Sequence, residues 1–131
     1  MLAVDTNVLV RLLVDDPREV EEVALARDAV QGAERVLIAD LVLVETIWVL
    51  RGKKYRFGKT QILDCFNRLL ENERYVWNNW DEVSAALGMY VSYDVDFADC
   101  MILVKAARAG AELVTLDRDL GAIDGVRLLS R

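Results

Sequence analysis

Short apolar runs alternate with longer stretches of helical periodicity along the whole chain. Strands that alternate with helices in this way form βαβ units, in which the strands run parallel and the helices cover the sheet. The short runs are nearly all apolar, as expected for strands that are covered on both faces. The sequence therefore predicts an α/β fold with a parallel sheet of five strands, at Leu2–Val4, Val36–Ala39, Tyr75–Trp77, Leu113–Leu116 and Val126–Leu129.

Helices are expected in the segments between these strands. The first is the best marked, because Asp16 is a candidate N-cap before Pro17 and Gly32 follows as a stop. Asp40 is a candidate N-cap for the next. The later helices are expected at Asp40 to about Arg51, Lys59–Leu70, Trp80–Tyr90 and Asp96–Ala109. No repeat, low-complexity tract or linker interrupts the pattern, so residues 1–131 are predicted to form a single domain.

Histidine is absent from the 131 residues, and its absence restricts the possible chemistry. Ser-His-Asp triads, zinc sites with His ligands and His acid–base relays are all excluded. Carboxylates must therefore carry any catalysis. The net charge of -6 argues against general coating of nucleic acid. It is compatible with a nuclease, because divalent cations and a local basic strip attract a polyanion.

The cysteines and the N-terminus indicate a reducing compartment. Cys65 and Cys100 lie in apolar helical patterns without metal-ligand spacing, so free thiols are expected rather than a disulfide. The N-terminus has no secretory signal pattern. The apolar runs are far shorter than the roughly 20 residues that cross a bilayer. We therefore expect a cytoplasmic protein that does not contact a membrane.

Four acidic residues stand where apolar segments end or are interrupted. Asp5 follows a predicted strand, and Asp117 follows another. Glu45 lies inside the apolar segment 41–50, and Asp99 lies inside the segment 95–104. A fold that brings the four together makes a site for a divalent cation.

Each acid also has a structural interpretation, which the sequence leaves open. Glu45 has apolar neighbours one turn away on both sides, so it lies either against the core or at its exposed rim. Asp99 shares the first helical turn with Asp96, the expected cap, where the helix dipole stabilises acids. Asp5 and Asp117 are either ligands at the carboxyl end of a parallel sheet or turn residues. The occurrence of all four at one end of the predicted sheet favours a functional site.

Mutual repulsion indicates which ligand such a site needs. Two carboxylates about 5 Å apart repel by roughly 3 kcal/mol at an effective dielectric constant of about 20. Several such pairs weigh heavily against a total stability of about 5 to 15 kcal/mol. Because every candidate ligand is a hard oxygen, Mg²⁺ or Mn²⁺ fits better than zinc.

Four motifs in this order and spacing resemble a known family. They are Val4-Asp5-Thr6-Asn7-Val8-Leu9, Val44-Glu45-Thr46-Ile47-Trp48-Val49-Leu50, Phe97-Ala98-Asp99-Cys100-Met101-Ile102 and Thr115-Leu116-Asp117-Arg118-Asp119. Over essentially its whole length the chain resembles a PIN-domain ribonuclease, and most of all the VapC-type toxins of toxin-antitoxin systems.

This resemblance implies a fold, a reaction and partners. The fold is a three-layer α/β/α sandwich around a central, mainly parallel five-stranded sheet. The reaction is magnesium-dependent hydrolysis of RNA phosphodiester bonds by an endoribonuclease, through a metal-activated water, with Mn²⁺ as a substitute. The toxin of such a type II pair is expected to form a homodimer and to bind a cognate antitoxin through a groove between helices. The implied catalytic and metal-binding residues are Asp5, Glu45, Asp99 and Asp117.

The same resemblance implies supporting residues. Asn7 and Thr115 match positions that brace the acids by hydrogen bonds. Asp119 matches a position for an accessory ligand, and Leu120 departs from the aromatic residue that often follows it. The participation of Asp96 and Asp119 stays open.

A basic segment, Arg51–Lys59, interleaves five cations with two aromatic residues. Its charges either meet an RNA backbone or satisfy a helix end and an exposed loop. Tyr55 or Phe57 is a candidate for stacking on a base, although Phe57 also suits inward packing at the helix start. The candidate RNA-binding residues are Arg11, Lys53, Lys54 and Arg56.

Two other functions remain possible at this stage. One is a catalytically idle PIN-like module that binds a partner, which the retention of all four acids disfavours. The other is phosphoryl transfer with Asp5 as the nucleophile. Asn7 stands where an enzyme of that kind needs a second acid.

Overall fold

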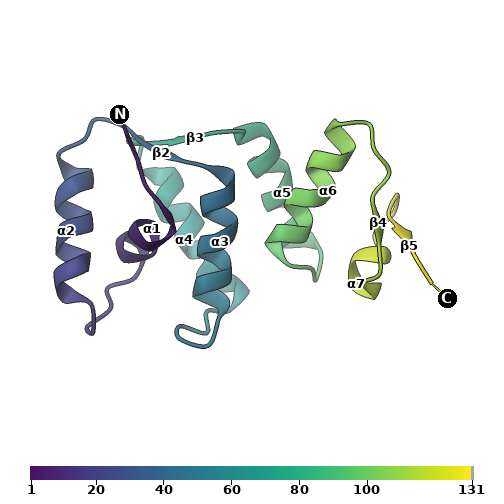
Figure 1. The fold of residues 1–131 in the computed structure, drawn as a ribbon, viewed down its shortest axis with the longest axis horizontal. Helices are drawn as coiled ribbons and strands as arrows, with labels where there is room; N and C mark the ends of the chain where they lie inside the picture. The colour runs from purple at the N-terminus through teal and green to yellow at the C-terminus, as the bar shows by residue number, and fades with distance from the viewer. Residues whose placement is uncertain (131) are drawn as a thin grey trace. The chain divides into compact units, whose positions relative to one another are not determined.

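A three-stranded parallel sheet organises the first part of the chain (Figure 1). Its strands, in sheet order, are β1 (Leu2–Ala3), β2 (Val36–Ile38) and β3 (Tyr75–Trp77). Leu2 pairs with Val36, which pairs in turn with Tyr75, and β2 is buried at Val36 and Ile38. The computed structural model describes residues 1–130, which form two compact units, one from Met1 to Asn78 and one that begins at Asn79.

The first unit contains four helices, α1 (Thr6–Leu13), α2 (Val20–Gln31), α3 (Asp40–Arg51) and α4 (Lys59–Glu71). Helix α1 packs against α2 and α3 and buries Leu9 and Leu13. Full burial of such a side chain stabilises the fold by about 1.5 to 3 kcal/mol, so these residues hold the short helix in place. Phe66 of α4 stacks on Trp77 of β3 with ring centroids 6.4 Å apart, which attaches α4 to the sheet.

The second unit contains α5 (Trp80–Ser92), α6 (Phe97–Arg108), β4 (Val114–Thr115), α7 (Arg118–Gly121) and β5 (Arg127–Leu128). Helices α5 and α6 pack through the buried rings of Tyr90 and Phe97, which meet edge to face at 5.8 Å. The two strands pair in parallel, with Val114 opposite Arg127. This unit is therefore a helix pair followed by a small βαβ element.

The predicted α/β class and the parallel pairing of the strands are confirmed, and all five strands are present. One feature differs, because the strands lie in a three-stranded and a two-stranded sheet rather than in one five-stranded sheet. Strands β4 and β5 have two residues each. Both residues of β4 pair with β5.

Two helices were not predicted, and one begins later than predicted. Helix α1 starts directly after Asp5, and α7 starts directly after Asp117, where the sequence suggested turns. Asp16 is not the N-cap of α2, which begins at Val20. The residues from Asp16 onward form a turn instead, closed by the amide of Glu19 on the carbonyl of Asp16 at 3.0 Å. Proline fits this turn as well as it fits a first helical position.

Two further predictions concern the cysteines and the absence of membrane-spanning segments. Cys65 and Cys100 are buried thiols and form no disulfide bond, as predicted. Within residues 1–130 no helix combines the length and the apolar character that a membrane crossing requires.

Asp16 is a buried carboxylate that ties two loops of the first unit together. Its Oδ1 accepts the backbone N–H of Arg18 at 2.9 Å, and its Oδ2 accepts the hydroxyl of Tyr55 at 3.0 Å. The ammonium group of Lys54 lies 3.6 Å from Oδ2. The Arg18 amide, the Tyr55 hydroxyl and the Arg18 guanidinium hold the pKa of Asp16 well below its usual range. The α3–α4 loop is thereby anchored on the loop between α1 and α2.

The substitution Asp16→Asn tests this anchor. Because the pKa of Asp16 is lowered in the folded protein, its contribution to stability is present above the unfolded pKa of about 3.9 and is lost as the pH falls further. We expect the variant to be less stable than the wild type at pH 7, with a difference that narrows below about pH 4. Urea unfolding at several pH values measures the free energies. Asp15, the exposed residue before Asp16, provides a control. The variant Asp15→Asn should leave the fall in unfolding free energy at acid pH unchanged. Equal pH slopes for wild type and Asp16→Asn would contradict the assignment.

Candidate functional site

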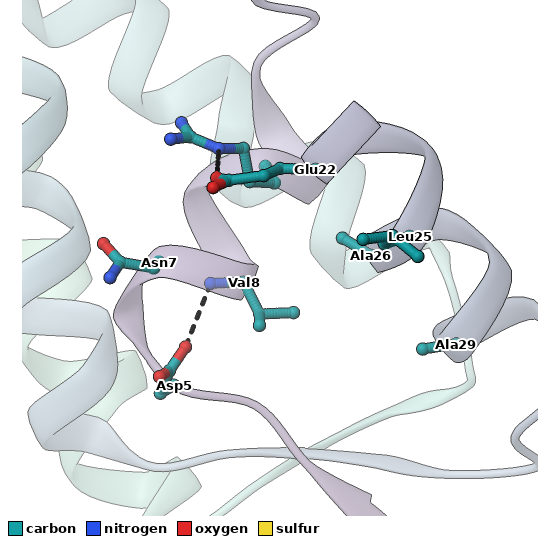
Figure 2. A pocket seen from close by; sticks show the side chains of 8 residues that line it. Asp5, Asn7, Val8, Glu22, Leu25, Ala26 and Ala29 are labelled. Atoms are coloured by element: carbon teal, nitrogen blue, oxygen red, sulfur yellow. Dashed lines mark hydrogen bonds and ion pairs between the residues drawn. The ribbon is translucent and has the colours of Figure 1, made fainter. Parts of the chain in front are cut away.

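Asp5 stands at the junction between β1 and α1 and acts as the N-cap of the helix. Its Oδ1 accepts the backbone N–H of Val8 at 3.0 Å (Figure 2). This bond satisfies one of the free N–H groups of the first turn and fixes the direction of the carboxylate. The side chain is exposed, and no other donor from residues 1–130 occupies Oδ2.

Glu45 lies in the middle of α3, the helix against which α1 packs. Its Oε2 accepts the hydroxyl of Thr6 at 3.1 Å. Thr6 is the residue after Asp5 and the first of α1. Asp5 is therefore followed directly by the residue that binds Glu45. Glu45 itself is half-buried, so it lies between the core and the exposed rim.

Asp117 repeats the arrangement of Asp5 at the junction between β4 and α7. Its Oδ1 accepts the backbone N–H of Asp119 at 2.8 Å and that of Leu120 at 3.3 Å. The hydroxyl of Thr115 accepts the N–H of Asp117 at 3.0 Å. Thr115 thus holds the backbone of Asp117, while Asp119 contributes its amide and keeps its own carboxylate exposed.

Asp99 lies in the first turn of α6 and is half-buried. Burial raises its pKa, and the negative charges of Asp96 and Asp117 raise it further. Asp96 occupies the predicted N-cap position, but its side chain makes no capping hydrogen bond. Asp96 and Asp117 therefore both lie within electrostatic reach of Asp99, and among residues 1–130 no cation contributes to its pKa.

The four predicted acids thus occur as one pair in each unit, Asp5 with Glu45 and Asp99 with Asp117. Within residues 1–130 no three Asp, Glu or Cys side chains are grouped closely enough to hold a metal ion. The chemistry of the pairs fits Mg²⁺ or Mn²⁺, because every donor is a carboxylate oxygen and no thiol or imidazole lies among them.

The two supporting residues that the resemblance implied differ in their contacts, and only Thr115 contacts one of the acids. Asn7 is exposed, and among residues 1–130 its amide makes no hydrogen bond to either acid of its unit. Thr6 makes such a bond instead, to Glu45, and the sequence did not predict this contact. The contact could have been predicted from the role of Asp5 as an N-cap. A helix that begins at Thr6 directs the side chain of Thr6 back toward its own N-terminus, where Asp5 lies.

The predicted RNA-binding cations divide into two kinds. Arg11 binds the carboxylate of Glu22 at 2.8 Å and the hydroxyl of Tyr55 at 3.1 Å. Lys54 lies within 4 Å of Glu19 as well as Asp16, so its charge is also balanced. The predicted positions that remain, Lys53 and Arg56, are exposed and form no ion pair within residues 1–130.

A cavity of about 360 Å³ opens between α1 and α2, beside Asp5. Figure 2 shows Asp5 and Glu22 on either side of Val8, with Leu25, Ala26 and Ala29 of α2 across from Val8. The lining of the cavity thus combines apolar side chains with the carboxylates of Asp5 and Glu22. Leu25 is 70% exposed, so this wall is open to a ligand.

The substitution Asp96→Asn tests the electrostatic coupling in the second unit. Because the charge of Asp96 raises the pKa of Asp99, its removal should lower that pKa toward the ordinary aspartate value. A carboxyl-carbon NMR titration of the metal-free protein measures the change. The control Asp124→Asn removes an exposed aspartate of the same unit and should leave the titration of Asp99 in place. An unchanged pKa in Asp96→Asn would show that the two residues are not neighbours.

Comparison with known proteins places these residues in a family. The model of the PIN domain matches residues 2–126, a range that runs through both units. A VapC toxin of Mycobacterium tuberculosis that cleaves the sarcin-ricin loop is 19% identical, with 98% of each chain covered and a TM-score of 0.44. A toxin-antitoxin complex from Klebsiella pneumoniae is 22% identical, with 96% of this chain and 95% of that chain covered and a TM-score of 0.37. No curated protein sequence matches the chain. Since the family model accounts for residues 2–126, the chain belongs to the PIN domain family.

Proposed function

We propose that the chain is a magnesium-dependent endoribonuclease whose catalytic and metal-binding residues are Asp5, Glu45, Asp99 and Asp117. The observation that carries the proposal is the family match over residues 2–126, which contains all four acids. In a chain without histidine, carboxylates are also the groups left for hydrolytic chemistry.

The residues have distinct roles in this proposal. Asp5 and Asp117 each present a carboxylate that is fixed through one oxygen by backbone N–H groups, which leaves the other oxygen for the ion. Glu45 is held through Oε2 by the side-chain hydroxyl of Thr6. Asp99 has no such donor, and its raised pKa reflects a charge that a cation would stabilise. When bound, Mg²⁺ supplies water activation and neutralises charge on the phosphodiester.

The exposed cations of the α3–α4 loop suit the substrate. Lys53 and Arg56 carry charges without acidic partners in residues 1–130, so we assign them to the phosphates of RNA. Arg11 and Lys54 are already paired with acids and serve first to hold the loop. A loop fixed in this way loses less entropy when it binds RNA.

We further propose that the protein is the toxin of a type II toxin-antitoxin pair, acting in the cytoplasm as a homodimer. The four motifs resemble toxins of this kind, and the cavity between α1 and α2 fits the partner. An antitoxin segment with apolar side chains would lie along Leu25 and Ala29, and a basic side chain would pair with Asp5. Such a segment would block the metal ligand that the toxin needs.

RNA cleavage with Asp5→Asn tests the proposed reaction. The wild type should cleave RNA when Mg²⁺ or Mn²⁺ is added. The variant should be slower by about 100-fold or more, because metal stabilisation is worth several kcal/mol and each 1.36 kcal/mol is a factor of ten. Gel analysis of labelled RNA measures the rates, and circular dichroism checks that the variant is folded. The control Asp64→Asn removes an exposed carboxylate of α4 and should keep full activity. Wild-type rates in Asp5→Asn would refute the mechanism.

Thermal stability with metal distinguishes an enzyme from an idle binding module. A ligand at 100 times its Kd stabilises the folded state by about 2.7 kcal/mol, a rise in Tm on the order of 10 °C. The wild type should show this rise with Mg²⁺. Glu45→Gln and Asp99→Asn, one from each unit, should each remove most of it. An unchanged rise in either variant would show that its residue is not a metal ligand, and the absence of a rise in the wild type would favour the binding module.

A further inference from the structure

We infer that Thr6 is a positioning residue of the nuclease, and that its hydroxyl sets the direction in which Glu45 presents its carboxylate to the metal ion. The inference rests on the proposed function. Its starting point is one contact, the hydrogen bond of 3.1 Å from Thr6 Oγ1 to Glu45 Oε2, between residues 39 positions apart in sequence.

The contact acts on one oxygen of Glu45 and leaves the other open. A carboxylate oxygen that accepts a hydroxyl has its position defined, whereas a free glutamate samples several rotamers of a long side chain. Within residues 1–130, Oε1 of Glu45 has no donor. The carboxylate is therefore oriented without being fully occupied, which is the condition that a metal ligand requires.

The backbone of Thr6 is itself fixed, so the hydroxyl is a firm anchor. Asp5, one residue earlier, caps α1 through its bond to Val8. Leu9 and Leu13 bury the other face of this helix. Thr6 is β-branched and half-buried, so its side chain has few alternative rotamers. The segment that carries the first acid thus also orients the second.

No other residue of the first unit does the same for Glu45. Asn7, which the family resemblance assigned to bracing, makes no hydrogen bond to an acid among residues 1–130. Thr46 adjoins Glu45 on α3, but its hydroxyl is buried and has no hydrogen-bond partner there. Thr46 is therefore a matched control, since Thr46→Val makes the same chemical change on a hydroxyl without a hydrogen bond.

The experiment compares Thr6→Val, Thr6→Ser and Thr46→Val in the full chain. Loss of an outer-shell partner weakens metal binding by about 10- to 100-fold, and calorimetric titration with Mn²⁺ alone should show this loss for Thr6→Val. Thr6→Ser restores the hydroxyl and should bind nearly as tightly as the wild type. Thr46→Val should match the wild type. Raising the Mg²⁺ concentration should recover part of the RNA cleavage lost in Thr6→Val, and circular dichroism without metal checks that the variant is folded.

A second measurement separates failure of the inference from failure of the proposed function. Unfolding free energies of Thr6→Val, Glu45→Leu and the double variant, measured without metal, give the coupling between the two side chains. Wild-type Mn²⁺ affinity in Thr6→Val overturns the inference and leaves the nuclease proposal standing. A wild type that binds no metal contradicts the nuclease proposal. In that case the coupling free energy between Thr6 and Glu45 tests whether the two side chains interact. A favourable coupling supports the Thr6–Glu45 hydrogen bond, and a coupling of zero contradicts it.

Discussion

The candidate site depends on two junctions at which a strand ends, an aspartate follows and a helix begins. At Asp5 and Asp117 the aspartate accepts backbone N–H groups of the helix that it starts. Each bond satisfies a donor that the helix cannot pair internally, so stability and side-chain direction come from the same contact. The two junctions carry different helices, since α1 has eight residues and α7 has four. The geometry of the carboxylate therefore follows from the first turn and not from the length of the helix.

The junctions also explain why the rest of the first unit is built as it is. Helix α1 is too short to be stable alone, and it persists because Leu9 and Leu13 pack against neighbouring helices. Its packing on α3 brings Thr6 to Glu45. At its other end, Arg11 binds Glu22 of α2 and the hydroxyl of Tyr55, which in turn binds Asp16. One eight-residue helix thus connects the acids, the cavity and the basic loop.

The sequence predicted the elements whose signals are local. Helices α4 and α6 lie within one residue of their predicted bounds, because apolar periodicity and capping residues mark them. Helix α1 escaped prediction since Val8, Leu9 and Val10 form an unbroken apolar run without a helical period. Asp16-Pro17 was misassigned because a helix start and a turn use the same residues. The Thr6–Glu45 contact had no local signal, since 39 residues separate its partners. The candidate acids could therefore be singled out from local sequence patterns, whereas the contacts that hold them depend on the packing.

The pKa values of Asp16 and Asp99 are shifted in opposite directions by their surroundings. Asp16 is nearly fully buried, yet its pKa is lowered, because an amide, a hydroxyl and two cations satisfy its charge. Asp99 is less buried, and its pKa is raised, because its partial burial is not offset by a donor from residues 1–130 and the negative charges of Asp96 and Asp117 add to the effect. Above its raised pKa, ionised Asp99 destabilises the metal-free fold, whereas ionised Asp16 stabilises the fold. Burial alone therefore does not decide the direction of a pKa shift. The direction depends on the partners of the carboxylate, and in the proposed function a divalent cation is the partner of opposite charge at Asp99.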